Sequence, residues 1–206
     1  MSNRYWFSVG ALALVAALAG IYVARMVTQP AVPSLEAGTS YPAPRVLPQF
    51  SLVDAQGKTV TPASLGGHPT LVFFGFTHCP DVCPLTLALL SSVQKRASMP
   101  NLKVAFITVD PERDTPAQVG AYVSSFGTDF IGLTGTAPEI LKATRGFGVA
   151  AARVELAGGG YTMDHSAAIF ALDSQARIVA VFTQPLSAEK LTRDVQRLAP
   201  VLNVRS

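Results

Sequence analysis

The fold is decided by the stretch Thr70-Leu71-Val72-Phe73-Phe74-Gly75-Phe76-Thr77-His78-Cys79-Pro80-Asp81-Val82-Cys83-Pro84. It joins an unbroken apolar run, typical of a fully buried strand, to a turn that carries the only two cysteines among 206 residues. Beyond the turn, Leu85, Leu89 and Val93 recur at helical spacing, which predicts a helix over 82–98. Another buried strand is expected over 103–109. Strand, helix and strand in this order predict a βαβ unit with parallel pairing.

The pattern of strands and helices continues to the end of the chain. A short hairpin is expected around Gln56-Gly57. Thr115 and Thr136 each stand before a proline and three residues before Gln or Glu, which predicts two capped helices. Further strands are expected over 130–133, 150–156, 165–172 and 178–183, and a last helix over 188–202. The order predicts an α/β, thioredoxin-like mixed sheet flanked by helices, with the two cysteines at its first strand-to-helix junction.

The N-terminal segment is the most apolar part of the chain. Twenty residues without a charge, 5–24, lie between Arg4 and Arg25, enough to cross a hydrocarbon core of about 30 Å as a helix. We therefore expect an N-terminal transmembrane anchor over residues 1–27, a proline-rich tether over 28–47 and the folded domain over 48–206. A cleaved signal peptide is the alternative, because Ala17-Leu18-Ala19 fits the small-x-small cleavage pattern.

Both interpretations of the N-terminus export the rest of the chain. An Arg- and Ser-rich leader is missing, so a bacterial inner membrane, with the domain in the periplasm, is the expected location. Without Arg4 and Arg25 the chain holds fourteen basic against thirteen acidic residues. This near-neutral balance argues against nucleic acid as a partner.

Cys79 and Cys83 stand four residues apart, one helical turn, so both sulfurs can face one point. We expect the N-terminus of the following helix to lower the pKa of both thiols and to favour the thiolates that metal ligation requires. Cu(I) is a soft ion that prefers thiolate, and imidazole suits both copper valences. From the residues alone, a structural disulfide, a redox-active pair and a metal site all remain open.

Three motifs favour a metal site over a structural disulfide. Gly75-Phe76-Thr77-His78-Cys79-Pro80-Asp81-Val82-Cys83-Pro84, Val109-Asp110-Pro111-Glu112-Arg113-Asp114-Thr115-Pro116 and Tyr161-Thr162-Met163-Asp164-His165-Ser166-Ala167 resemble the Sco/SenC family of membrane-anchored copper proteins that serve cytochrome c oxidase assembly. The resemblance implies that Cys79, Cys83 and His165 bind copper, as Cu(I) or Cu(II). One departure is the glycine-rich loop at 157–160, which need not position His165 as in relatives.

Several neighbouring polar residues have structural explanations. His78 is expected to orient other groups or to be structural, His68 to lie in a turn, and Asp81 to cap the helix. Asp164 either orients His165 through a hydrogen bond or is solvated. Residues 110–114 are expected to form a salt-bridged loop that holds the next helix in place.

The leading hypothesis is a copper chaperone, and not an enzyme in the usual sense. It would pass copper from Cys79, Cys83 and His165 to the dinuclear copper centre in the copper-bearing subunit of cytochrome c oxidase. A periplasmic copper carrier or a thiol reductant would be a further partner. The second hypothesis is a thiol-disulfide oxidoreductase that uses Cys79 and Cys83 to reduce the cysteines of the oxidase copper site. A thioredoxin-like peroxidase is weaker, since no peroxide pocket is evident.

Overall fold

The computed structural model describes residues 13–20 and 33–203. Residues 13–20 are helical, and the chain from Pro33 onward is a separate compact unit, hereafter the domain. None of the described helices combines the length and apolar character needed to cross a bilayer. Much of the expected anchor, 5–12 and 21–24, lies outside the described residues, so the anchor stays a prediction.

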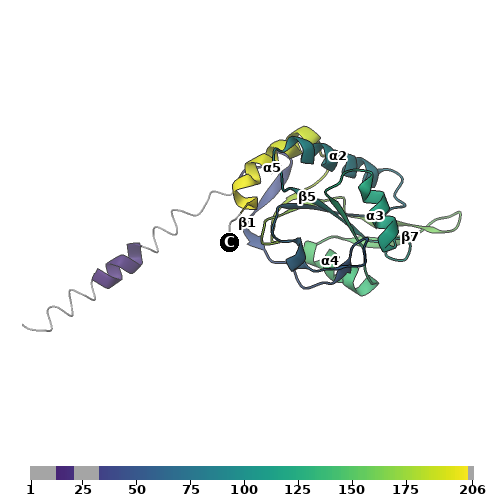
Figure 1. The fold of residues 1–206 in the computed structure, drawn as a ribbon, viewed down its shortest axis with the longest axis horizontal. Coiled ribbons are helices and arrows are strands. Elements are labelled where there is room, and N and C mark those ends of the chain that lie inside the picture. Colours follow the sequence, from purple (N-terminus) through teal and green to yellow (C-terminus); the bar gives the residue numbers. More distant parts are fainter. Residues whose placement is uncertain (1–12, 21–32, 204–206) are drawn as a thin grey trace, which may run out of the picture. The chain divides into compact units, whose positions relative to one another are not determined.

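A six-stranded mixed sheet forms the centre of the domain (Figure 1). The strands β4, β5 and β6 pair in parallel, and the other neighbours pair antiparallel, as expected for a thioredoxin-like sheet. In spatial order the strands are β1 (Gly38–Arg45), β10 (Ile178–Phe182), β9 (Ile169–Leu172), β4 (Thr70–Gly75), β5 (Lys103–Thr108) and β6 (Phe130–Leu133).

Helices cover both faces of this sheet. Because parallel crossovers are right-handed, α2 (Val82–Arg96) and α3 (Pro116–Ser124) lie on one face, where the ring of Phe106 packs 5.7 Å from that of Tyr122. α5 (Ala188–Leu202) lies beside α2, and α4 (Ala137–Phe147) lies on the opposite face (Figure 1). There Phe74 packs 5.1 Å from Phe147. Phe73 packs against Phe106, 6.1 Å away, so Phe73 and Phe74 point to opposite faces, as neighbours on a strand do.

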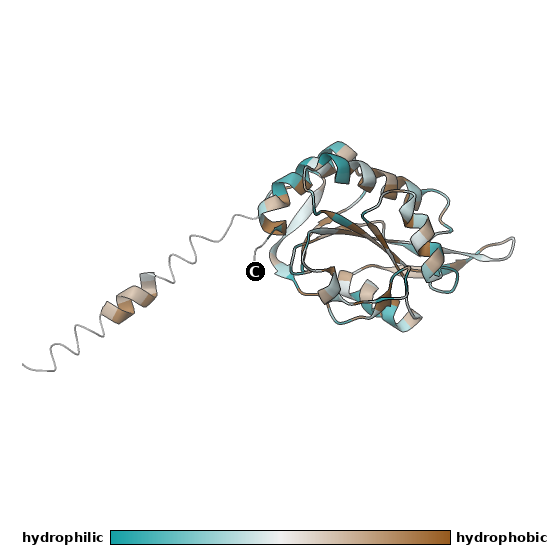
Figure 2. Ribbon diagram, in the orientation of Figure 1, coloured by the Kyte–Doolittle hydropathy of each residue, from teal (hydrophilic) through white to brown (hydrophobic). Residues whose placement is uncertain are grey.

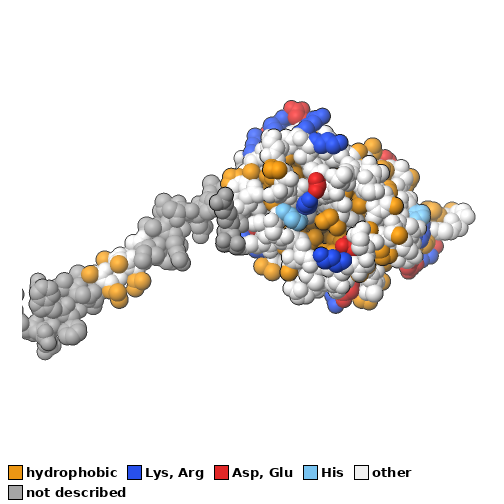
Figure 3. All heavy atoms as spheres, in the orientation of Figure 1, with side chains coloured by type: hydrophobic (Ala, Val, Ile, Leu, Met, Phe, Trp, Pro, Cys, Tyr) orange, Lys and Arg blue, Asp and Glu red, His pale blue; other side chains and the backbone are white. Residues whose placement is uncertain are grey.

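The core explains why the predicted central strands form. All six residues of β4 are buried, and the apolar colour of the central strands contrasts with the polar outer sides of the helices (Figure 2). The side chains of Phe73, Phe74, Phe76 and Phe106 are all at most 2% exposed. On the face of the domain in Figure 3, several basic side chains lie beside acidic ones.

Two short antiparallel pairs lie outside the main sheet. β2 (Leu52–Val53) and β3 (Thr59–Val60) form the hairpin expected around Gln56-Gly57, followed by a 3₁₀ helix, η1 (Pro62–Leu65). β7 (Ala151–Glu155) and β8 (Tyr161–His165) form a two-stranded ribbon that extends from the body of the domain (Figure 1). We call residues 151–165 the ribbon.

The structure corrects two expectations from the sequence. Residues 38–45, assigned to the tether, form β1 and pair with β10. Pro42 and Pro44 are tolerated because β1 is an edge strand. The strand expected over 165–172 is in fact two: β8 ends at His165, and β9 begins at Ile169.

Candidate metal centre

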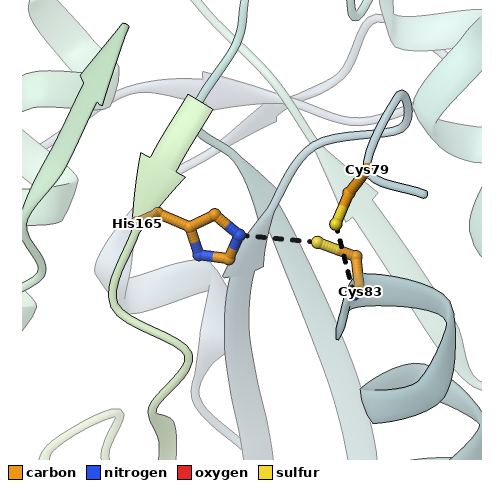
Figure 4. A group of neighbouring side chains, drawn as sticks. All are labelled: Cys79, Cys83 and His165. Atoms are coloured by element: carbon orange, nitrogen blue, oxygen red, sulfur yellow. Dashed lines mark hydrogen bonds between the residues drawn. The ribbon is translucent and has the colours of Figure 1, made fainter. Parts of the chain in front are cut away.

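The two cysteines and His165 meet at one end of the sheet, although they come from three different elements (Figure 4). Cys79 lies in the turn after β4, Cys83 in the first turn of α2, and His165 at the end of β8. Cys83 Sγ is 3.5 Å from His165 Nε2, and all three donor atoms lie within 4.8 Å of one another. The structure therefore brings together the three residues that the sequence singled out.

The first turn of α2 and the glycine at the end of β4, Gly75, set the positions of the two cysteine side chains. The backbone amide of Cys83 donates to Cys79 Sγ at 3.5 Å, so the helical turn directs both sulfurs to one side. A Cβ atom on Gly75 would lie 2.8 Å from Cys83 Sγ and 2.8 Å from Phe106 Cε2. The buried Cys83 side chain therefore needs glycine at the end of β4. Both cysteines are free thiols, and Cys79 is partly exposed.

The cysteine turn is tied to the neighbouring loop by Asp114. This fully buried carboxylate accepts hydrogen bonds from the amide (2.9 Å) and hydroxyl (2.5 Å) of Thr77, and from the hydroxyl of Thr108 (2.5 Å). Asp114 was expected only to take part in a salt-bridged loop. Its contact with Thr77 makes it a support of the cysteine turn that sequence reasoning missed.

The imidazole of His165 is set in an aromatic corner. Its ring stands edge-on to Phe76 at 5.8 Å and to Phe73 at 6.2 Å. His165 Nδ1 lies 3.2 Å from the carbonyl of Ser166, which can only accept, so Nδ1 carries the proton and Nε2 presents its lone pair to the sulfurs. Burial lowers the pKa of His165, which favours the neutral form that a metal ligand needs.

The thiol chemistry differs from the sequence-based expectation. Burial raises the pKa of the Cys83 thiol, against the predicted lowering by the helix N-terminus, because loss of solvent around a fully buried sulfur outweighs the helix dipole.

Asp81 occupies the N-cap of α2, but its side chain makes no capping hydrogen bond. The prediction that Asp81 caps the helix is therefore right in position and wrong in mechanism.

The remaining candidates fall outside the donor set. His78 is exposed and contacts the Thr77 hydroxyl at 3.1 Å, while His68 contacts Thr70 at 3.0 Å in a turn. Asp164 is exposed, and the hydrogen bond that orients His165 goes to Ser166 instead. Met163, which is not among the ligands predicted from the sequence, lines the same depression as Cys79 and His165.

This donor set fits copper. Two thiolates and one imidazole are soft to intermediate ligands, which suit Cu(I) and also Cu(II), whereas hard ions prefer oxygen. With three protein donors, two of which, Cys79 and His165, belong to residues that line a surface depression, the site is open to exchange of ligands with another molecule.

The model of the SCO1/SenC family matches residues 38–200. The chain belongs to the SCO1/SenC family. The match begins where β1 begins, in agreement with the corrected start of the domain, and the resemblance noted from the three motifs is confirmed.

Individual members of the family are similar over most of the domain. The mitochondrial SCO2 homolog of Bos taurus is 38% identical over 158 residues, which are 72% of this chain and 58% of that protein. The chain thus spans little more than half of the bovine relative.

Solved structures of family members include copper-bound ones. The copper-bound structure of Bradyrhizobium japonicum ScoI is 43% identical, with a TM-score of 0.67, and the match covers 74% of this chain and 98% of that one. Copper-bound Arabidopsis thaliana ScoI is 34% identical, with a TM-score of 0.71 and the same coverage.

Proposed function

We propose that this protein is a copper chaperone that binds one copper ion through Cys79, Cys83 and His165. The observation that carries the proposal is the convergence of two free sulfurs and one neutral imidazole within 4.8 Å. Copper-bound relatives with the same fold support the choice of metal. Copper in this role is cargo, which the protein receives and hands on.

The proposed recipient is the dinuclear copper centre of cytochrome c oxidase, in the copper-bearing subunit. Membership of a family that serves oxidase assembly supports this recipient. Transfer requires the recipient's thiolates to replace Cys79, Cys83 and His165 one at a time. The partly exposed Cys79 is the sulfur that an incoming ligand reaches first, since Cys83 is buried. We further propose that the segment 1–27 anchors the protein in a bacterial inner membrane, with the domain in the periplasm.

A thiol-disulfide oxidoreductase is the second candidate function. It is favoured by the two free thiols that lie side by side, one of them accessible to a substrate disulfide. In this case Cys79 attacks the substrate disulfide, and Cys83 then attacks the mixed disulfide, so that the substrate leaves as a dithiol and Cys79 and Cys83 are oxidised to a disulfide. His165 has no necessary part in that exchange.

The two functions are separated by incubating the full chain with the purified copper-bearing oxidase subunit. Copper-loaded wild type is expected to transfer Cu(I) to the reduced apo-subunit. When His165→Ala is loaded with the same amount of copper, a competing chelator is expected to remove that copper before it reaches the subunit. Reduction of the oxidised subunit by the metal-free dithiol is the readout for the alternative. Efficient reduction that is unchanged in His165→Ala, without any copper transfer by wild type, would favour the oxidoreductase.

A further inference from the structure

The ribbon that carries His165 has little support of its own. All five residues of β7 are exposed, and β8 is only partly buried. Among the described residues, hydrogen bonds, ion pairs and ring contacts attach the ribbon to the rest of the domain through Arg153, which pairs with Glu112, and through the two end residues of β8. One of these end residues is His165 itself, against Phe73 and Phe76. The other is Tyr161, at the opposite end of the same strand.

Tyr161 is held by loop 110–114. Its hydroxyl donates to Asp110 Oδ1 at 2.8 Å, and its carbonyl accepts from Arg113 Nη1 at 3.0 Å. The guanidinium of Arg113 lies over the ring, with its carbon 3.8 Å from the centroid. Asp110 is buried and pairs with Arg113 Nε at 2.5 Å, so the group that receives the hydroxyl is itself fixed.

A second guanidinium, that of Arg153, also contacts the Tyr161 ring. Arg153 lies on the paired strand of the ribbon, 3.7 Å from the Tyr161 centroid, and reaches Glu112 at 3.1 Å. The ring of Tyr161 is therefore contacted by two cations, one from the ribbon and one from the loop. Stacking of cations on an aromatic ring is favourable, most of all where water is partly excluded.

The register of β8 connects this contact to the copper ligand. Side chains two apart on a strand point to the same face, so Tyr161 and His165 share a face. The four residue steps from Tyr161 to His165 span roughly 13 Å at the rise of an extended strand. A ribbon attached at Tyr161 cannot rotate about its own axis, and such a rotation would turn His165 away from the sulfurs.

We propose that Tyr161 is a positioning residue of the copper site, which acts through His165. The contacts of its ring and hydroxyl with loop 110–114 hold the ribbon so that His165 Nε2 faces Cys83 Sγ. Loop 110–114 thereby supports both halves of the site, because Asp114 also holds Thr77 in the cysteine turn. The proposal rests on the proposed function, since it takes His165 to be a copper ligand.

The test is the Cu(I) affinity of the purified full chain, measured by competition with a chromophoric chelator. Tyr161→Ala is expected to weaken binding by about tenfold to a hundredfold, the usual cost of losing a group that orients a metal ligand. Tyr161→Phe keeps the ring between the guanidinium groups, and its Cu(I) affinity is expected to stay within about threefold of wild type, since only one hydrogen bond is lost.

The matched control is Tyr41→Ala, which removes another tyrosine stacked on an arginine, Arg45, on β1. It should bind copper as wild type does.

A double-mutant cycle with His165→Ala separates positioning from general damage. If Tyr161 acts through His165, adding Tyr161→Ala to His165→Ala changes the affinity no further. An equal loss in both backgrounds, or wild-type affinity in Tyr161→Ala, overturns the positioning role. If Tyr161→Ala does not fold, Arg113→Lys replaces it in the cycle, because lysine keeps the charge of Arg113 but not its planar stacking on Tyr161. Arg113→Lys is likewise expected to weaken Cu(I) binding in wild type and to have no further effect in His165→Ala. Unchanged affinity in His165→Ala alone would instead contradict the three-ligand site.

Discussion

The buried carboxylate of Asp114 accepts hydrogen bonds from both the amide and the hydroxyl of Thr77, two residues before Cys79. The loop after β5 and the turn after β4 are thereby locked to each other. Since β4 and β5 are parallel neighbours, their carboxyl ends lie at the same edge of the sheet, where such a lock can form.

Replacing Asp114 with Ala is therefore expected to destabilise the domain. Three donors, two on Thr77 and one on Thr108, lose their acceptor, and the free energy of unfolding should fall by about 3 kcal/mol. Urea unfolding followed by circular dichroism measures this. The control, Asp81→Ala, removes an exposed carboxylate without a capping bond and should stay within about 0.5 kcal/mol of wild type. Equal stability of the two variants would contradict the lock.

Gly75→Ala should disturb the cysteine site directly. The new methyl group would stand 2.8 Å from Cys83 Sγ, so the sulfur or the strand must shift, at a cost of about 1–3 kcal/mol. We expect lower stability together with weaker Cu(I) binding. Gly158→Ala, where no atom lies within 4 Å, is the matched control and should change neither quantity. A fully stable Gly75→Ala with normal affinity would show that the packing against Cys83 is loose.

The two thiols should differ in reactivity. Burial raises the pKa of Cys83, so its thiolate fraction at pH 8 is smaller than that of an ordinary cysteine, while Cys79 is partly exposed. Limited alkylation of the reduced, metal-free chain, read by peptide mass spectrometry, is expected to label Cys79 first. Labelling of Cys83 should still accelerate above pH 9, because its thiol has yet to ionise there. Faster labelling of Cys83 would be incompatible with this environment.

The segment before residue 46 should contribute to stability. Asp194 on α5, fully buried, accepts from the amides of Glu36 (2.9 Å) and Ala37 (2.7 Å), and β1 pairs with β10. A chain that begins at residue 46 should be less stable than one that begins at 33 by about 3 kcal/mol or more, since a buried carboxylate loses two donors. Thermal unfolding compares the two. Equal melting temperatures would restore the tether interpretation of this segment.

The parts of the fold that sequence reasoning predicted correctly are those with strong local signals. The continuous apolar run of β4, the capping threonine of α3 and Ser187 before α5 all mark their elements within a few residues. The strands that it missed have weak signals: β1 is an edge strand with prolines, and β8 belongs to a ribbon whose residues are exposed or only partly buried.

The same contrast holds for the site. Cys79, Cys83 and His165 could be identified because each stands in a motif. The support from Asp114 and Tyr161 depends on contacts across 37 and 51 positions, which local patterns do not reveal. The pKa of Cys83 was predicted in the wrong direction because the helix N-terminus is visible in the sequence, whereas the burial of one sulfur is set by tertiary packing.

Titration of Cu(I) into the reduced full chain, against a competing chelator, is the decisive test of a copper site with three protein ligands. Wild type is compared with Cys79→Ser, Cys83→Ser and His165→Ala, and with His78→Ala as a control histidine next to Cys79. One tight equivalent of Cu(I) is expected in wild type and in His78→Ala, and none in the other three variants. Tight binding that survives in His165→Ala, or no tight equivalent in wild type, would contradict a site with three protein ligands.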